Sequence, residues 1–426
     1  MTTDQFYALC AAGPLLLDGA TGTQLQLAGM PSGVCPETWV LDHPTVLEDL
    51  QHAYLSAGSS IIYAFTFGAN RLKLAAHHLN PDETGDINRR LAAISTSVRD
   101  QWHKDHPELS VWVAGDLAPT GLFLSPAGDL AFEDLVSLYR EQVRAQLAAG
   151  VDLFVAETMM DLAQTRAAVL AVQAECDLPI MTSLTFEANG RTLSGNTPQE
   201  CLITLAALGA AAFGMNCSFG PDKLIELLQP LLAISPLPLL AKPNAGMPYM
   251  INGQTRFPMQ AAAFAAAMRP MAAAGVRLLG GCCGTDPEYI ARLADELQLQ
   301  PAFTRQKPSD CGQWICSSRQ SVSLDSTAGL PVILCQTPGQ LADDVLDQLD
   351  DDPPAAVLDL SAARPAEESS VWIEALLQLQ LMTAVPLIFK DIPSFLSGDL
   401  LRIYQGRAGI TGSYTGKTYG ALYLPQ

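Results

Sequence analysis

The sequence predicts an α/β fold: a (β/α)8 barrel of the TIM type, followed by a smaller C-terminal α/β module. Three observations predict the barrel. Short aliphatic runs recur along residues 15–284, helix-length segments rich in Ala and Leu separate them, and distinctive polar motifs follow the runs directly. Most runs are almost continuously apolar, which is typical of strands buried on both faces of a parallel sheet. Eight such strand-then-helix units in this length are typical of a TIM-type barrel.

The expected strands follow one another along the chain. They cover residues 15–18, 60–67, 111–117, 151–157, 180–186, 212–217, 239–243 and 276–281. Helical segments such as residues 134–149 and 261–274 fill the gaps between them. The gaps after the first two strands are longer, so we expect insertions or lids there.

The polar motifs locate the functional end of this barrel. In such barrels the active site lies at the carboxyl ends of the strands. The expected strands end in Asp18-Gly19, Thr66-Phe67, Gly115-Asp116, Glu157-Thr158, Asn216-Cys217, Pro243-Asn244 and Cys282-Cys283. Independent motifs would rarely fall on one face by accident, so this agreement supports both the barrel and the position of its site.

Three cysteines indicate the chemistry. Cys282 and Cys283 are adjacent, with glycines on both sides, and Cys217 lies upstream at the end of another strand. Three converging thiolates would hold a zinc ion and leave its fourth position open, as catalytic zinc sites do. Sulfur ligands select zinc over hard cations such as magnesium. Taken alone, the adjacent pair could also be two packed thiols or a vicinal disulfide.

Composition narrows the classes of function. Apolar residues make up 49% of the chain and the formal net charge is −20, which exclude global disorder and disfavour nucleic acids and anionic membranes as partners. The N-terminal residues have no signal-peptide pattern, and no apolar stretch reaches the ~20 residues of a bilayer span. Ten cysteines at irregular spacing indicate a reduced, cytoplasmic protein rather than a disulfide framework.

The character of the sequence changes after the barrel, which we assign to residues 1–299. Residues 300–328 contain Pro301, Pro308 and a Ser-rich stretch, so we interpret them as a linker. Residues 329–426 predict a small α/β module, or about half of a second barrel. Its strands are expected at residues 332–335, 356–360, 386–389 and 409–411.

Five motifs carry a family resemblance. They are DGATGT at residues 18–23, RTLSG at 191–195, GMNCSFGP at 214–221, PNAGMP at 243–248 and GGCCGT at 280–285. In this order and at this spacing they resemble the homocysteine S-methyltransferase family. The greatest likeness is to the N-terminal homocysteine-binding barrel of cobalamin-dependent methionine synthase. The resemblance covers about residues 13–298, roughly two-thirds of the chain.

The resemblance implies a metal centre. Cys217, Cys282 and Cys283 would hold zinc, and Asn244 would lie beside it, at the open position when substrate is absent. Zinc would deprotonate the substrate thiol, whose free pKa is near ~8.5, and so create a nucleophile. The expected reaction is methyl transfer to the thiol of homocysteine, giving methionine. Without the resemblance, Asn244 could simply support the turn before Gly246.

The resemblance also implies a site for the amino-acid end of homocysteine. Asp18, Gly19 and Glu157 would bind it, with the two carboxylates facing the substrate ammonium. Ser183, on the fifth strand, would lie near the substrate carboxylate. On the residues alone, Glu157 could instead be a structural acid at a strand end.

Two departures from the family leave the methyl donor open. Residues 64–67 read Ala-Phe-Thr-Phe, closer to betaine-using relatives than to the Thr-Asn-Thr-Phe of methionine synthases. The residues after the barrel are too few for a folate-binding barrel, and no Asp-x-His-x-x-Gly corrinoid motif occurs. Residues 386–391 and 401–411 faintly resemble part of a pterin-binding domain, which would make the module a truncated remnant or a docking module.

Three hypotheses follow. In the first, the donor is methylcobalamin on a separate corrinoid protein, which the C-terminal module helps to dock. In the second, S-methylmethionine, betaine or another onium compound supplies the methyl group, and Phe65, Phe67 and Tyr249 form an aromatic box for its cation. In the third, the chain is a non-catalytic scaffold subunit, which the intact cysteine triad disfavours.

Overall fold

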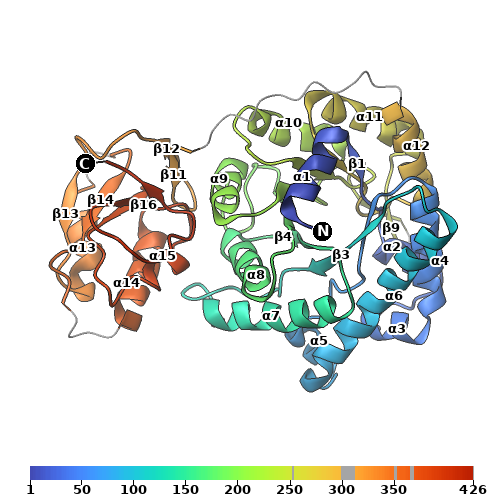
Figure 1. The fold of residues 1–426 in the computed structure, drawn as a ribbon, viewed down its shortest axis with the longest axis horizontal. Coiled ribbons are helices and arrows are strands. Elements are labelled where there is room, and N and C mark those ends of the chain that lie inside the picture. The colour runs from blue at the N-terminus through green and yellow to red at the C-terminus, as the bar shows by residue number, and fades with distance from the viewer. Residues whose placement is uncertain (252–253, 299–311, 350–352, 365–368, 426) are drawn as a thin grey trace.

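The computed structural model describes residues 1–251, 254–298, 312–349, 353–364 and 369–425. Its largest sheet has eight strands in the order β1-β10-β7-β6-β5-β4-β3-β2, all paired in parallel. A parallel bridge between Leu17 and Ile61 joins the two outer strands, so the sheet closes on itself (Figure 1). The predicted (β/α)8 barrel is therefore confirmed.

Each barrel strand overlaps its predicted range. The strands are β1 (Leu15–Leu16), β2 (Ile61–Tyr63), β3 (Trp112–Leu117), β4 (Leu153–Met159), β5 (Ile180–Leu184), β6 (Ala212–Asn216), β7 (Leu239–Lys242) and β10 (Leu278–Leu279). Most of their side chains are buried, because helices cover the outside of the barrel and side chains fill its inside. Burial on both faces explains the nearly continuous apolar runs.

Helices surround the barrel. They are α2 (Gly22–Leu27), α3 (Pro36–Asp42), α4 (Pro44–Ser56), α5 (Arg71–Ala76), η1 (Pro81–Glu83), α6 (Thr84–Asp105), α7 (Phe132–Ala148), α8 (Leu162–Glu175), α9 (Pro198–Leu208), α10 (Pro221–Leu232), α11 (Ala261–Ala274) and α12 (Pro287–Gln298). Proline begins several of them, where its missing N–H costs no hydrogen bond. The long gaps after the first two strands hold the extra helices α2, α3 and α5.

Helix α1 (Thr3–Ala12) lies across the amino-terminal end of the barrel (Figure 1). A capping box between Thr2 and Gln5 begins it. Its buried side chains, Phe6 and Cys10, pack into one cluster with barrel residues Leu17, Ile61, Leu153, Met181 and Leu278. This apolar plug fills one end of the barrel, and the polar strand ends lie at the other.

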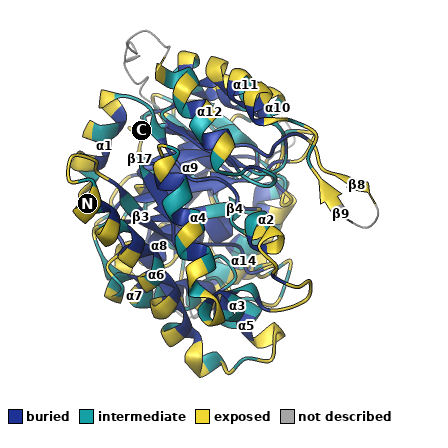
Figure 2. Cartoon of the chain, turned by 90° about the vertical axis from the view of Figure 1, so that its right-hand side faces the viewer, coloured by how far each residue is buried: buried dark blue, intermediate teal, exposed yellow. Residues whose placement is uncertain are grey.

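A short hairpin projects beyond the polar end (Figure 2). It consists of β8 (Tyr249–Ile251) and β9 (Gln254–Arg256), which follow β7 and which the sequence analysis did not predict. All three residues of β8 are exposed. The hairpin therefore lies outside the core, and its apolar residues do not follow a core-forming pattern.

The C-terminal module is a second α/β unit. Its parallel sheet runs β13 (Val332–Leu334), β14 (Ala356–Asp359), β15 (Leu387–Lys390), β16 (Gly409–Thr411), β17 (Leu422–Tyr423) in sequential order, as half of a barrel would. The four strands that we expected are present, and β17 is additional. One face carries η2 (Pro338–Gln340), α13 (Leu341–Leu346), α14 (Ser369–Met382) and α15 (Leu400–Ile403).

A hairpin covers the face of this sheet that the helices leave free. It pairs β11 (Trp314–Cys316) with β12 (Ser321–Ser323), and Ile315 packs against Val357, Ile388 and Leu424. The linker expected at residues 300–328 therefore contains an ordered hairpin. Its three-residue strands are too short and too rich in serine for an apolar pattern to predict. Residues 300–311 of that expected linker lie outside the described residues.

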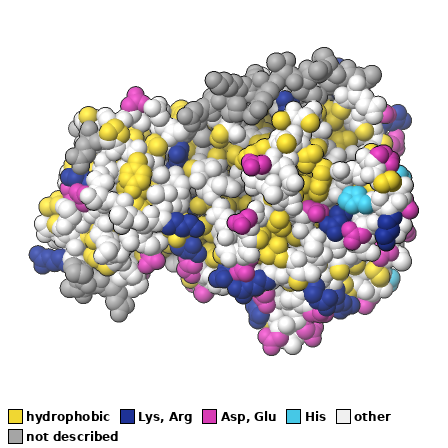
Figure 3. Space-filling model, viewed as in Figure 1, with side chains coloured by type: hydrophobic (Ala, Val, Ile, Leu, Met, Phe, Trp, Pro, Cys, Tyr) yellow, Lys and Arg dark blue, Asp and Glu magenta, His cyan; other side chains and the backbone are white. Residues whose placement is uncertain are grey.

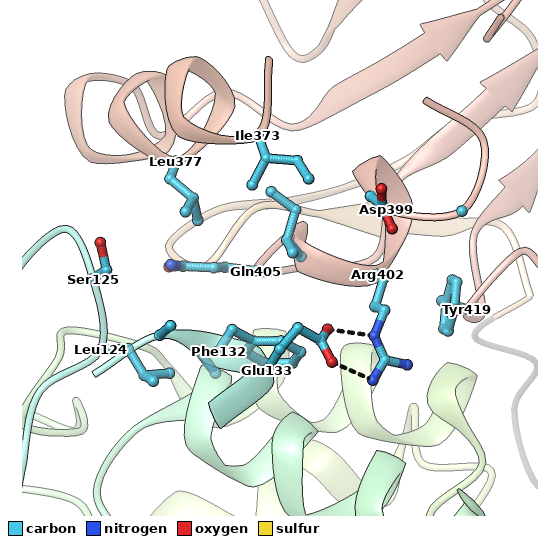
Figure 4. Close-up of a pocket in the computed structure, with 14 residues that line it drawn as sticks. Leu124, Ser125, Phe132, Glu133, Ile373, Leu377, Asp399, Arg402, Gln405 and Tyr419 are labelled. Atoms are coloured by element: carbon cyan, nitrogen blue, oxygen red, sulfur yellow. Dashed lines mark hydrogen bonds and ion pairs between the residues drawn. The ribbon is translucent and has the colours of Figure 1, made fainter. Parts of the chain in front are cut away.

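The barrel and the module have separate apolar cores and share a polar interface. Arg402 of α15 makes two hydrogen bonds to Glu133 at the start of α7, and buried Arg166 of α8 donates to the Arg402 carbonyl oxygen (2.8 Å). Beside these bonds lies a cavity of about 510 Å³, lined partly by Phe132 and Leu377 (Figure 4). The two cores support our proposal that barrel and module are distinct domains.

The surface agrees with the composition. Figure 3 shows acidic and basic side chains interspersed over one face of the molecule, with basic groups near the junction of barrel and module. Among the described residues, no helix combines the length and the apolarity that crossing a membrane requires.

The plug makes a testable prediction. Phe6→Ala should lower the free energy of unfolding by about 3–5 kcal/mol, because it empties a buried aromatic site. Tyr7→Ala is the matched control, since the neighbouring Tyr7 is 36% exposed and should cost about 1 kcal/mol or less. Urea unfolding followed by circular dichroism measures both. Equal losses would contradict the role of α1 as the apolar plug.

Candidate functional site

Three sulfur atoms meet at the polar end of the barrel. Cys217 follows β6, whereas Cys282 and Cys283 follow β10, and their Sγ atoms all lie within 4.8 Å of one another. Zn–S bonds of about 2.3 Å place the sulfurs of a tetrahedral site about 3.8 Å apart, so the spacing fits one ion. All three are free thiols, so the vicinal disulfide does not form here. Within the described ranges this is the one cluster of His, Cys, Asp or Glu with such spacing.

The loop after β7 holds both cysteine loops in place. The Cys217 N–H donates to the carbonyl oxygen of Lys242 (3.0 Å), and the Cys282 N–H donates to the next carbonyl oxygen of the same segment (2.8 Å). The Ala245 N–H donates to the carbonyl oxygen of Cys283 (3.0 Å). Backbone bonds thus fix the loops that carry the three sulfurs relative to one another.

The backbone at these cysteines is unusual. Cys217 and Ser218 both have positive φ angles, 59° and 60°, which cost free energy in residues other than glycine. Gly284 also has a positive φ (82°), and a Cβ there would lie 2.2 Å from the Phe257 ring. Such conformations persist only where the surroundings enforce them, so the neighbouring structure holds the cysteine loops in place.

Hydrogen bonds among the three cysteines shift the pKa values of their thiols in opposite directions. Hydrogen bonds from Cys282 and Cys283 lower the pKa of Cys217 to about 2. The hydrogen bonds to Cys217 raise the pKa of Cys282 well above its ordinary value and that of Cys283 to about 11. This donor set fits a soft cation such as zinc, which takes thiolate ligands.

Asn216 connects the cysteines to neighbouring strands. Its Oδ1 accepts from the Thr158 N–H (2.8 Å) and from the Ser183 hydroxyl (2.8 Å), and its Nδ2 donates to the Thr158 hydroxyl (2.7 Å). The same Nδ2 lies 3.9 Å from the Cys282 sulfur. Ser183 therefore lies beside the cysteine cluster, and its hydroxyl donates to Asn216. Sequence analysis placed Asn216 at a strand end without giving it a role.

Asn244 lies beside the sulfurs, as the resemblance implied. Its side chain hydrogen-bonds Cys217, and its backbone N–H donates to the Phe219 carbonyl oxygen (2.9 Å). Its Oδ1 is buried and has no partner among the described residues. Asn244 also accepts the Gly246 N–H (2.7 Å) through its carbonyl oxygen, so it supports the turn as well.

Asp18 forms a buried ion pair that the sequence analysis missed. Its Oδ1 lies 2.6 Å from Lys242 Nζ, with both side chains 3–4% exposed, and its Oδ2 accepts the Tyr63 N–H (2.7 Å). Burial opposes the charge on Lys242, yet Asp18 raises the pKa of Lys242 well above its ordinary value. In the sequence, Lys242 could be recognised only as a single charged residue at the end of an apolar strand.

Glu157 and Asp116 form a hydrogen-bonded pair of carboxyls from β4 and β3. Burial, followed by the charge of Glu157, raises the pKa of Asp116 well above its ordinary value. Burial also raises the pKa of Glu157, although Lys242 opposes this shift. Two carboxylates in contact cannot both stay charged, so the pair holds one proton. Sequence analysis noted Asp116 at its strand end but assigned it no function.

Gly19 lies close to the loop that carries Cys282 and Cys283. A Cβ there would lie 2.7 Å from Tyr54 Oη and 2.9 Å from Thr285 Oγ1, so no side chain fits. Next to it, Ala20 donates its N–H to Thr285 Oγ1 (3.1 Å), and Thr285 Oγ1 donates to the Cys282 carbonyl oxygen (2.8 Å). The backbone that follows β1 is thereby fixed relative to the sulfurs.

The three rings suggested for an aromatic box differ in burial and in their neighbours. Phe65 is buried, and the Nζ of Lys73 lies 4.5 Å from the centroid of the Phe67 ring. Tyr249 is 45% exposed on the β8–β9 hairpin. Lys73 therefore already occupies one face of the Phe67 ring.

Fold and site together define a TIM-barrel protein with a cluster of three cysteines beside a buried cluster of charges. The chain belongs to the homocysteine S-methyltransferase family, whose model matches residues 15–297. This match confirms the resemblance drawn from the motifs.

Known relatives match the barrel. Methionine synthases of Mycobacterium leprae and Mycobacterium tuberculosis are 32% and 31% identical to it over 289 residues, which is 65% of this chain. The chain spans about a quarter (24%) of the length of these curated relatives. The metallated form of the Escherichia coli homocysteine methyltransferase MmuM has the same fold, with a TM-score of 0.58 and 24% identity over 68% of this chain and 98% of that one.

The network around Asn216 predicts a supporting role in metal binding. Asn216→Ala should weaken zinc binding by about 10- to 100-fold, as loss of a group that orients metal ligands does. Competition with a chelator of known affinity measures the change. The control is Asn189→Ala, because Asn189 is exposed on the loop after β5. Unchanged zinc affinity in Asn216→Ala would show that the cysteines hold their positions without it.

Proposed function

We propose that this protein is a zinc-dependent homocysteine S-methyltransferase that forms methionine. The observation that carries this proposal is the convergence of Cys217, Cys282 and Cys283 at the polar end of a barrel of this family. A zinc ion held there would lower the pKa of the substrate thiol and make it a nucleophile at neutral pH. The scaffold hypothesis would leave this strained and preorganised cluster unexplained.

The chain's own residues would bind and orient the amino-acid end of the substrate. Glu157 offers a negative charge to the ammonium, and the crowded backbone at Gly19 gives the substrate a rigid wall. Asp18 and Ser183 support the site through their bonds to Lys242 and Asn216. Asn244, with its free amide oxygen beside Cys217, is suited to lie next to the reacting sulfur.

We propose a methylated corrinoid on a separate protein as the methyl donor, with the C-terminal module helping to dock it. The likeness of the barrel to two methionine synthases supports this donor. Lys73 over the ring of Phe67 disfavours a cationic donor at that ring. The alternative donor, S-methylmethionine, betaine or another onium compound, is favoured by Phe65, at the position where the sequence departs from methionine synthases. The free cysteines agree with a reducing, cytoplasmic location.

The test uses zinc-loaded protein with homocysteine and methylcobalamin under anaerobic conditions. Methionine should form, measured by mass spectrometry, as the methylcobalamin absorbance is lost. Cys282→Ser should abolish turnover and lower zinc affinity by about 100-fold or more, since a lost ligand costs more than a lost supporting group. Cys335→Ser is the control, because Cys335 is a buried thiol of the module.

Each outcome of this test selects a donor. Methionine formed from S-methylmethionine or betaine, but not from methylcobalamin, would establish the onium alternative. Zinc bound without methionine from any of these donors, and without methionine from a methylated corrinoid protein, would contradict the proposed reaction.

A further inference from the structure

We propose that Asp116 is a further substrate-binding residue, which accepts a hydrogen bond from the substrate ammonium beside Glu157. This inference rests on the proposed function, because the ligand it concerns is an amino-acid thiol. It gives to Asp116 the contact that the family resemblance gave to Asp18.

Asp18 is already committed to the protein. Its Oδ1 accepts from Lys242 Nζ at 2.6 Å, and its Oδ2 accepts the Tyr63 N–H at 2.7 Å. The charge of Asp18 is matched by that of Lys242 in a setting nearly closed to water. A substrate ammonium would have to compete with Lys242 for the same carboxylate, so Asp18 is poorly placed to be its main acceptor.

Asp116, in contrast, has a carboxyl oxygen that accepts no hydrogen bond from a described residue. It is 2% exposed, and its Oδ1 is buried without a partner among the described residues. Its backbone is held firmly, because its carbonyl oxygen accepts from Thr66 Oγ1 (2.8 Å) and from Gln146 Nε2 (3.2 Å). A buried polar atom without a partner is costly and calls for an explanation, which a bound donor would supply.

Two other buried atoms support the interpretation that a polar ligand binds here. Tyr63 Oη and Asn244 Oδ1 are also buried without partners in the described part of the chain. Tyr63 lies within electrostatic reach of Asp116, Glu157 and Lys242. The three atoms without partners come from the ends of β2, β3 and β7, so the polar end of the barrel offers several unused contacts to one polar ligand.

The charges of the cluster match an ammonium. Asp18 and Lys242 cancel each other, whereas Asp116 and Glu157 share one proton and so hold a single negative charge. If Asp116 carries the proton and donates it to Glu157, the other carboxyl oxygen of Asp116 remains an acceptor. A single ammonium would then neutralise the cluster, and a substrate without an amino group would leave one charge buried and unmatched.

The experiment measures binding by calorimetry on zinc-loaded protein. The ligands are homocysteine and 4-mercaptobutanoate, which is homocysteine without its amino group. Asp116→Ala should weaken homocysteine binding by about 10- to 100-fold, as loss of a charge-assisted hydrogen bond does, and change binding of the analogue far less. Asp116→Asn should restore much of the loss, because its amide can donate to Glu157 and still accept from the ammonium.

Matched variants complete the design. Asp152→Ala removes the same residue type from the opposite end of the barrel, where Asp152 pairs with Arg99 and accepts the Val113 N–H. It should alter homocysteine affinity by about twofold or less, as distant sites do. Asp116→Leu, which fills the space, replaces Asp116→Ala if that variant does not fold.

The possible results separate this inference from the proposed function. Equal losses for homocysteine and its deaminated analogue would overturn the role of Asp116. So would an amino-group preference that survives in Asp116→Ala and disappears in Asp18→Asn. Failure of the wild-type zinc-loaded protein to bind homocysteine would overturn the proposed function itself, and this inference with it.

Discussion

Both halves of the site depend on one residue at the end of β7. The carbonyl oxygen of Lys242 accepts the Cys217 N–H, which places the first sulfur, while its Nζ pairs with Asp18. The segment that follows then bonds to Cys282 and Cys283. A buried lysine costs free energy unless it is paired, so the ion pair with Asp18 stabilises the same strand end that orients the cysteine loops.

The polar end of the barrel combines two kinds of preorganisation. Backbone hydrogen bonds and left-handed residues place the sulfurs, and paired charges shape the space beside them. Neither arrangement requires a large movement before a ligand binds. Supporting residues such as Asn216 resemble the residues that hydrogen-bond known metal ligands. Such residues orient the ligands and do not bind the metal themselves.

The barrel could be predicted from the sequence because strands buried on both faces leave long apolar runs. The three cysteines could be singled out because their pattern with neighbouring glycines is distinctive. It missed the hairpins β8–β9 and β11–β12, whose three-residue strands carry too little periodicity. It also missed the pairing of Lys242 with Asp18. These residues are 224 positions apart, and they meet because β1 and β7 both pair with β10. Likewise Asp116 was visible as a polar strand end, but its free oxygen is a property of the packed structure.

X-ray absorption at the zinc edge of the purified protein, with and without homocysteine, tests the central claim most directly. The account predicts one zinc ion with three sulfur neighbours at about 2.3 Å, and a fourth sulfur once homocysteine is added. A metal ion with fewer than three sulfur neighbours, or a sulfur count that homocysteine leaves unchanged, would contradict it.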